Sequence, residues 1–138
     1  MRLPEQIART RFAAARAVRM ATVDETGRPH LVVMTFAVDG DRIYSAVDAK
    51  PKSTRDLKRL RNIQADPRVT VLADHYEDEW SRLWWVRADA TAQIIEDPEA
   101  MAEPIGLLRE RYRQYRANPP EGPVIALTVH KWTGWSAS

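Results

Sequence analysis

Apolar residues alternate with polar ones in several short segments of the chain, and Gly, Pro, Asn or Asp lies between these segments. Such alternation predicts β-strands, because successive side chains of a strand point to opposite faces of a sheet. The expected strands are residues 18–24, 31–38, 42–47, 68–74, 82–95 and 124–135. The first three are joined by turns too short for a parallel crossover, which predicts antiparallel pairing.

Three other segments show helical spacing. The first, over 4–16, carries Ile7 and Phe12 on its apolar stripe. The second, over 53–66, begins with a Ser-x-x-Asp capping pattern, and the third runs from Asp97 to about residue 115. Six mostly antiparallel strands in a chain of 138 residues favour a single domain, residues 1–138, built as a closed or half-closed β-barrel with flanking helices.

Composition restricts the chemistry that this domain can perform. Hydrophobic residues are 44% and charged residues 29% of the chain, as in ordinary globular proteins. No apolar run is long enough to span a bilayer and no secretory signal opens the sequence, so a cytoplasmic location without a membrane partner is expected. The absence of cysteine excludes disulfides, iron–sulfur clusters and thiol nucleophiles, so any redox chemistry must come from a cofactor.

Other catalytic and binding motifs are missing. The three histidines are widely separated, which predicts no metal site. The sequence has no G-x-S-x-G elbow for a serine nucleophile and no glycine-rich loop of the dinucleotide or Walker type. No side chain can therefore be named as catalytic from a motif.

Charge is concentrated in one segment. Lys and Arg total 21 against 19 Asp and Glu, a net charge of +2, which is too small to indicate nucleic-acid binding. Residues 50–61 (KPKSTRDLKRLR) are strongly basic, and Lys50, Lys52 and Ser53 meet at an expected helix start. Two ammonium groups, a hydroxyl and helix N-terminal amides suit a phosphate, although a solvated basic loop would have the same composition.

Two adjacent tryptophans lie in an expected strand. On a strand, Trp84 and Trp85 point to opposite faces, so both cannot contribute to the same core. The partner of the second ring could be another subunit, a bound aromatic ring or the domain core. Aromatic residues are enriched in subunit interfaces, which favours the first of these.

Four segments carry a resemblance that covers nearly the whole chain: ATVDETGRPHLVVMTFAVDGDRIYSAVDAKPK, LKRLRNIQADPRV, DEWSRLWWVRADA and HKWTGW. They resemble the split β-barrel flavin and deazaflavin oxidoreductases related to pyridoxamine 5′-phosphate oxidase. The KPK, SRLWWVRAD and WTGW elements are most similar to an actinobacterial branch of deazaflavin-dependent enzymes that use coenzyme F420. Relatives bind FMN, the deazaflavin or haem on one scaffold.

The resemblance implies a six-stranded antiparallel split β-barrel that forms a homodimer with two cofactor sites at the subunit interface. It implies that the second strand faces the cofactor ring, that a basic segment holds the phosphate, and that residues of the tryptophan segment approach across the dimer. The implied cofactor-binding residues are Val33, Met34 and Thr35 beside the ring, Lys50, Lys52, Ser53, Arg55 and Arg59 for the phosphate, and Trp80, Arg82, Trp84 and Trp85 from the neighbouring strands.

The implied reaction is hydride transfer between the reduced F420 and a small electron-poor substrate, with Tyr44, Tyr76 and His75 as candidate proton donors. Pyridoxamine oxidation is not expected, because Lys-Pro-Lys replaces a Ser-Arg-Lys-like run and the arginine-rich C-terminal motif is absent. One alternative is a non-catalytic carrier or sequestering protein for FMN, haem or F420. The other, a single-stranded nucleic-acid platform made of residues 50–61 and Trp84, is disfavoured by the small net charge.

Overall fold

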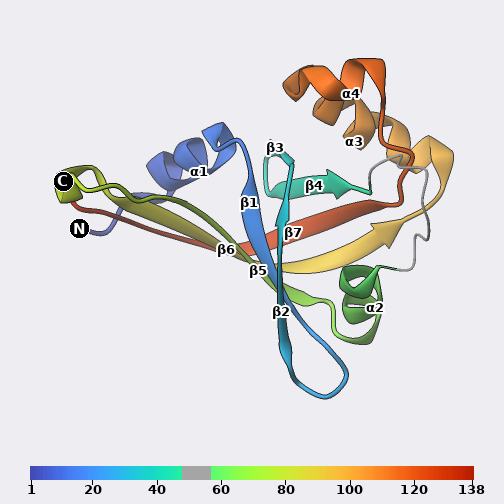
Figure 1. Ribbon diagram of the computed structural model, residues 1–138, viewed down its shortest axis with the longest axis horizontal. Helices are drawn as coiled ribbons and strands as arrows, with labels where there is room; N and C mark the ends of the chain where they lie inside the picture. The colour runs from blue at the N-terminus through green and yellow to red at the C-terminus, as the bar shows by residue number, and fades with distance from the viewer. Residues whose placement is uncertain (48–56) are drawn as a thin grey trace.

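The structure is a computed structural model that describes residues 1–47 and 57–138 of the chain. Within these ranges it contains a seven-stranded antiparallel sheet with the order β2-β1-β5-β6-β7-β4-β3 (Figure 1). The strands are β1 (Val18–Val23), β2 (Pro29–Met34), β3 (Ala37–Asp39), β4 (Arg42–Ala46), β5 (Arg68–His75), β6 (Trp84–Ile95) and β7 (Val124–Ser136). The helices are α1 (Glu5–Ala14), α2 (Lys58–Ala65), α3 (Pro98–Arg111), α4 (Arg113–Ala117) and the short 3-10 helix η1 (Trp80–Arg82).

The sheet curls on itself but does not close. Its two edge strands, β2 and β3, are consecutive in the chain and are joined by Thr35 and Phe36, so one sharp bend brings the two ends of the sheet together. Among the described residues no ladder of hydrogen bonds joins β2 to β3. The predicted mainly β, antiparallel architecture with flanking helices is therefore confirmed as a half-open barrel.

The strand count differs from the six predicted, because the apolar run 31–38 forms two strands. The Phe36 side chain is fully buried at the break. The backbone groups at the break bond to side chains instead of to a neighbouring strand. Tertiary hydrogen bonds, which the apolar pattern does not reveal, therefore end β2 and turn the chain into β3.

Helix α1 covers one end of the barrel. Its Phe12 ring packs edge-on against Phe36 and Trp132, with ring centroids 5.3 and 5.1 Å apart. Ala8 is buried beside Phe12, whereas Ile7, which was predicted to share the apolar stripe, is 45% exposed. The prediction for Ile7 was wrong because residues four positions apart share a helix face and residues five positions apart do not.

Helices α3 and α4 lie above β3 and β4, on the same side of the sheet in Figure 1 as α1, and α2 lies on the opposite side. The single helix predicted to run to residue 115 is broken at Tyr112, whose backbone is extended (φ −116°, ψ 119°). Helix α2 ends at Ala65, immediately before the predicted Asp66-Pro67 stop. Its predicted capping residue, Ser53, lies outside the described residues.

None of the helices in the described ranges combines the length and the apolar composition needed to cross a membrane.

Candidate functional site

The end of β2 holds the three residues predicted to lie beside a cofactor ring. The alternation of the strand points the Val33 side chain to solvent, where it is 63% exposed, and the Met34 side chain into the core, where it is 4% exposed. Thr35 follows at the bend and is half-buried. Because β2 is an edge strand, one side of its backbone has no strand partner among the described residues. The segment therefore offers an apolar side chain and backbone hydrogen-bonding groups at the surface.

The polar groups of Thr35 are held by two other elements. Its carbonyl oxygen accepts a hydrogen bond from Ser45 Oγ at 2.7 Å, and its Oγ1 lies 2.8 Å from the hydroxyl of Tyr115. The helix α4 thus places a tyrosine hydroxyl beside the last residues of β2. Sequence reasoning missed Tyr115, because its contact with Thr35 joins residues 80 positions apart and no local pattern signals it.

Tyr112 fixes the same bend from inside the molecule. Its hydroxyl accepts the Phe36 N–H at 3.1 Å and donates to the Arg16 carbonyl at 2.9 Å. The side chain is 8% exposed. One buried hydroxyl therefore links the bend, the segment before β1 and the end of α3.

The predicted phosphate clamp cannot be placed. Lys50, Lys52, Ser53 and Arg55 lie outside the described residues. Arg59 is described and lies in the first turn of α2, where its side chain is half-buried.

The tryptophan segment occupies the other end of the long β6–β7 ribbon. Trp84 packs against the main core, whereas Trp85 faces outward with the Arg87 guanidinium 5.3 Å from its ring centroid, so the predicted opposite orientations are confirmed. Trp80 is 75% exposed and, with Arg82, belongs to η1. Figure 1 shows this hairpin, in yellow-green beside the two termini, far from the β2–β3 bend. Within one chain, Trp80 and Arg82 are therefore not brought together with Val33 and Thr35.

The candidate proton donors are also dispersed. His75 and Tyr76 lie in this distant hairpin, where the His75 ring contacts the Glu77 carboxylate. Tyr44 on β4 packs against the second core cluster beneath α3. Neither His75 nor Tyr76 meets the bend, where Tyr115 provides a hydroxyl instead.

One continuous surface nevertheless connects the two regions. Strand register aligns Val33 with Arg19, Arg19 with Leu72, and Leu72 with Arg87, so these side chains form a row across β2, β1, β5 and β6. We call this surface the outer face. Its exposed aliphatic residues include Leu31 at 66% and Val33 at 63% exposure.

The outer face contains a shallow hollow and an ion pair. The hollow, of about 380 Å³, is lined by Leu72, Asp74, Tyr76, Trp85 and Arg87. Arg19 Nη1 lies 3.1 Å from Asp74 Oδ1 at its margin. The surface combines apolar area with charges of both signs, a composition suited to contact with another protein surface.

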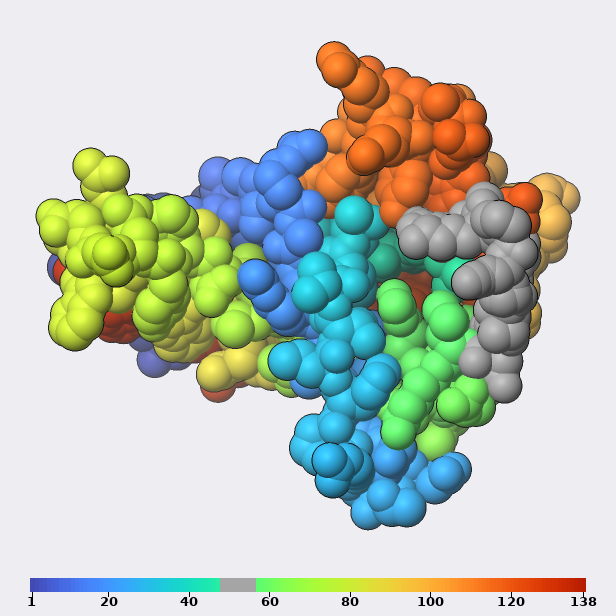
Figure 2. Space-filling model, in the orientation of Figure 1, coloured from blue at the N-terminus to red at the C-terminus, as the bar shows by residue number. Residues whose placement is uncertain are grey.

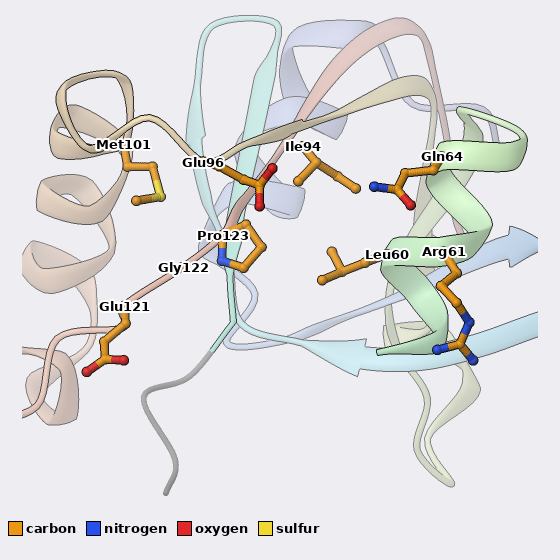
Figure 3. A pocket seen from close by; sticks show the side chains of 9 residues that line it. All are labelled: Leu60, Arg61, Gln64, Ile94, Glu96, Met101, Glu121, Gly122 and Pro123. Atoms are coloured by element: carbon orange, nitrogen blue, oxygen red, sulfur yellow. The ribbon is translucent and has the colours of Figure 1, made fainter. Parts of the chain in front are cut away.

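A second hollow, of about 250 Å³, lies between α2 and the start of α3. Figure 3 shows Met101 and Glu121 on its α3 side, Leu60 and Gln64 on its α2 side, and Glu96 between them. Of the described residues predicted to bind a cofactor, none lines this hollow.

Comparison with known proteins agrees with the fold. The chain resembles a conserved hypothetical protein of Mycobacterium tuberculosis (TM-score 0.75, 23% identity, covering 98% of this chain and 86% of that one). It also resembles the heme storage protein of Vibrio cholerae (TM-score 0.73, 20% identity, covering 99% of this chain and 95% of that one). A third similar structure is a FAD-binding protein of Mesorhizobium loti (TM-score 0.73, 16% identity, covering 97% of this chain and 95% of that one). Among curated proteins nothing matches significantly. The model of the family described as pyridoxamine 5′-phosphate oxidase matches residues 4–136, and the chain therefore belongs to this family.

Proposed function

We propose that the protein is an oxidoreductase that uses coenzyme F420 to transfer a hydride to a small electron-poor organic substrate. The observation that carries the proposal is the end of β2, where an exposed apolar residue, Val33, precedes a threonine hydroxyl hydrogen-bonded to Tyr115. The fold supports a flavin-type ligand, and the KPK and SRLWWVRAD elements favour the deazaflavin over FMN.

The residues at this edge fit a flat, partly polar ring. Val33 offers apolar contact, and the side of the β2 backbone without a strand partner among residues 1–47 and 57–138 offers donors and acceptors to the polar edge of the ring. When bound, the reduced coenzyme supplies the hydride, and the protein supplies binding and orientation. The Thr35–Tyr115 pair would hold a hydroxyl proton for transfer to a substrate bound at this edge.

A homodimer is the second part of the proposal. The outer face bears Leu31 and Val33, both more than half exposed, and a hollow beside Trp85. A second copy on this face would bury that apolar surface, and a two-fold arrangement would let Arg19 and Asp74 meet their counterparts. In such a dimer, Trp80 and Arg82 of one subunit would reach toward the β2 edge of the other.

The experiment is a titration of the purified protein with F420 and separately with FMN, followed by quenching of tryptophan fluorescence. We expect tighter binding of F420 than of FMN, and oxidation of reduced F420 by at least one member of a panel of enones, quinones and nitro compounds. Tighter binding of FMN would assign the protein to the flavin branch. Binding of neither would remove the cofactor assignment.

A non-catalytic binding protein is the alternative, favoured by the similarity of fold to a heme storage protein over nearly the whole length of both chains. This alternative predicts tight binding of haem, FMN or F420 without hydride transfer to any acceptor. A change in the absorbance of reduced F420 upon addition of an acceptor, dependent on protein concentration, would exclude it.

A further inference from the structure

Two arginines from separate parts of the chain lie near one aromatic ring, that of Tyr112, beside the β2–β3 bend. Arg111 ends α3 and its guanidinium lies 4.5 Å from the ring centroid of Phe36 and 5.4 Å from that of Tyr112. Arg16, between α1 and β1, places its guanidinium 5.4 Å from the same Tyr112 ring. Figure 2 shows the blue segment before β1, the orange α3–α4 region and the cyan β2–β3 region meeting on one face.

Neither guanidinium has an acidic partner in the described part of the chain. Other arginines do: Arg9 lies 2.7 Å from Asp41, and Arg68 lies 2.8 Å from Asp66. No carboxylate of residues 1–47 or 57–138 lies within 4.0 Å of Arg16 or Arg111. Arg111 donates a hydrogen bond to the Ala15 carbonyl oxygen.

This arrangement is electrostatically unfavourable in the absence of an anion. Burial lowers the pKa of Arg111, the interaction with Tyr112 raises it, and the positive charge of Arg16 lowers it, so that the pKa is lowered overall. A guanidinium carries five N–H donors, and the bond to Ala15 uses only part of that capacity. The guanidinium of Arg111 lies over the Phe36 ring and that of Arg16 lies over the Tyr112 ring. A guanidinium has the planar fork of donors that binds a carboxylate in a bidentate manner.

We propose that Arg16 and Arg111 form a binding site for the carboxylate group of a small organic acid. A carboxylate fits better than a phosphate dianion, because helix α1 ends at Ala14 and helix α3 ends at Arg111, and helix C-termini carry partial negative charge.

The position of the site gives it a role in substrate selection. Arg111 packs on Phe36, the residue after Thr35, and Tyr112 packs edge-on against Tyr115 with ring centroids 5.6 Å apart. An acid bound here would extend toward the Thr35–Tyr115 hydroxyl pair. This step rests on the proposed function and makes the substrate an electron-poor carboxylic acid. The carboxylate site itself does not require the cofactor.

The test measures binding without cofactor. The protein is titrated with succinate and with inorganic phosphate at constant ionic strength set by NaCl, and backbone amide chemical shifts are followed by NMR. We expect saturable shifts with succinate at residues 15–17, 36 and 111–113, and weaker binding of phosphate. Arg16→Gln should weaken succinate binding about tenfold, whereas Arg28→Gln, which removes an equal charge in the β1–β2 turn, should leave it unchanged.

Arg16 carries the test because its side chain is exposed, so that its replacement is compatible with folding. Arg111→Lys, which keeps the charge and loses the planar fork, should also weaken binding in a folded protein. Three results would each overturn the assignment: no saturable shift with succinate, equal affinity in wild type and Arg16→Gln, or tighter binding of phosphate than of succinate. The cofactor titration has an independent outcome, so failure of the two proposals can be told apart.

Discussion

The Tyr112 hydroxyl connects three segments that are distant in the sequence, and its replacement tests how much the bend depends on it. In Tyr112→Phe, the buried Phe36 N–H and Arg16 carbonyl both lose their side-chain partner while the ring remains in place. Leaving the buried Phe36 N–H unsatisfied costs about 1–3 kcal/mol, whereas water can replace the partner of the carbonyl of exposed Arg16, so we expect the free energy of unfolding in urea to fall by about 1–3 kcal/mol. Tyr76→Phe, at a 63% exposed tyrosine, is the matched control and should change the free energy of unfolding little.

A second prediction at the residue scale concerns Lys50 and Lys52 and rests on the sequence alone. If both ammonium groups contact the cofactor phosphate, the double change to Ala removes two charge-assisted contacts of about 1.5–3 kcal/mol each. The affinity for F420 should then fall at least a hundredfold in the fluorescence titration. Lys131→Ala, at an exposed lysine of β7, should bind as wild type does. A folded double variant with unchanged affinity would refute the phosphate assignment.

Among the elements, the packing of α1 on β7 depends on a glycine. A Cβ at Gly134 would lie 3.0 Å from Ala8 Cβ and 3.2 Å from Leu3 Cδ1, so Gly134→Ala forces α1 away from the sheet. We expect a loss of about 1–3 kcal/mol in the free energy of unfolding. Gly106→Ala in α3 is the matched control, because nothing lies within 4 Å of its added Cβ, and a gain of up to about 1 kcal/mol is expected there. Equal effects of both changes would mean that α1 does not pack closely there.

Element by element, the sequence predicts what depends on local periodicity. The alternation in β6 predicts correctly that Trp84 and Trp85 point to opposite faces, because that depends only on strand geometry. The division of residues 31–38 into two strands depends on Tyr112, which is more than seventy residues away. The same is true of the site: the exposure of Val33 follows from its strand, but the Thr35–Tyr115 contact follows from tertiary packing.

At the scale of the whole molecule, the outer face determines whether the proposed site is complete in one chain. Leu31 and Val33 are exposed on β2, and register carries the same surface across β1 and β5 to the hollow beside Trp85. A stable dimer buries about 800 Å² per partner, and a sheet face of several strands can supply such an area. We therefore expect the wild-type protein to sediment as a dimer at micromolar concentration.

Leu31→Asp should convert that dimer to a folded monomer, because a carboxylate would be buried in an apolar contact without a partner. The matched control is Ile7→Asp, at an exposed aliphatic residue of α1 away from the outer face, which should stay dimeric. If Trp80 and Arg82 act across the interface, the Leu31→Asp monomer also loses affinity for F420, although its β2 backbone is unchanged. A Leu31→Asp monomer with wild-type affinity would place the entire site within one chain, and a Leu31→Asp protein that remains dimeric would place the interface on another surface.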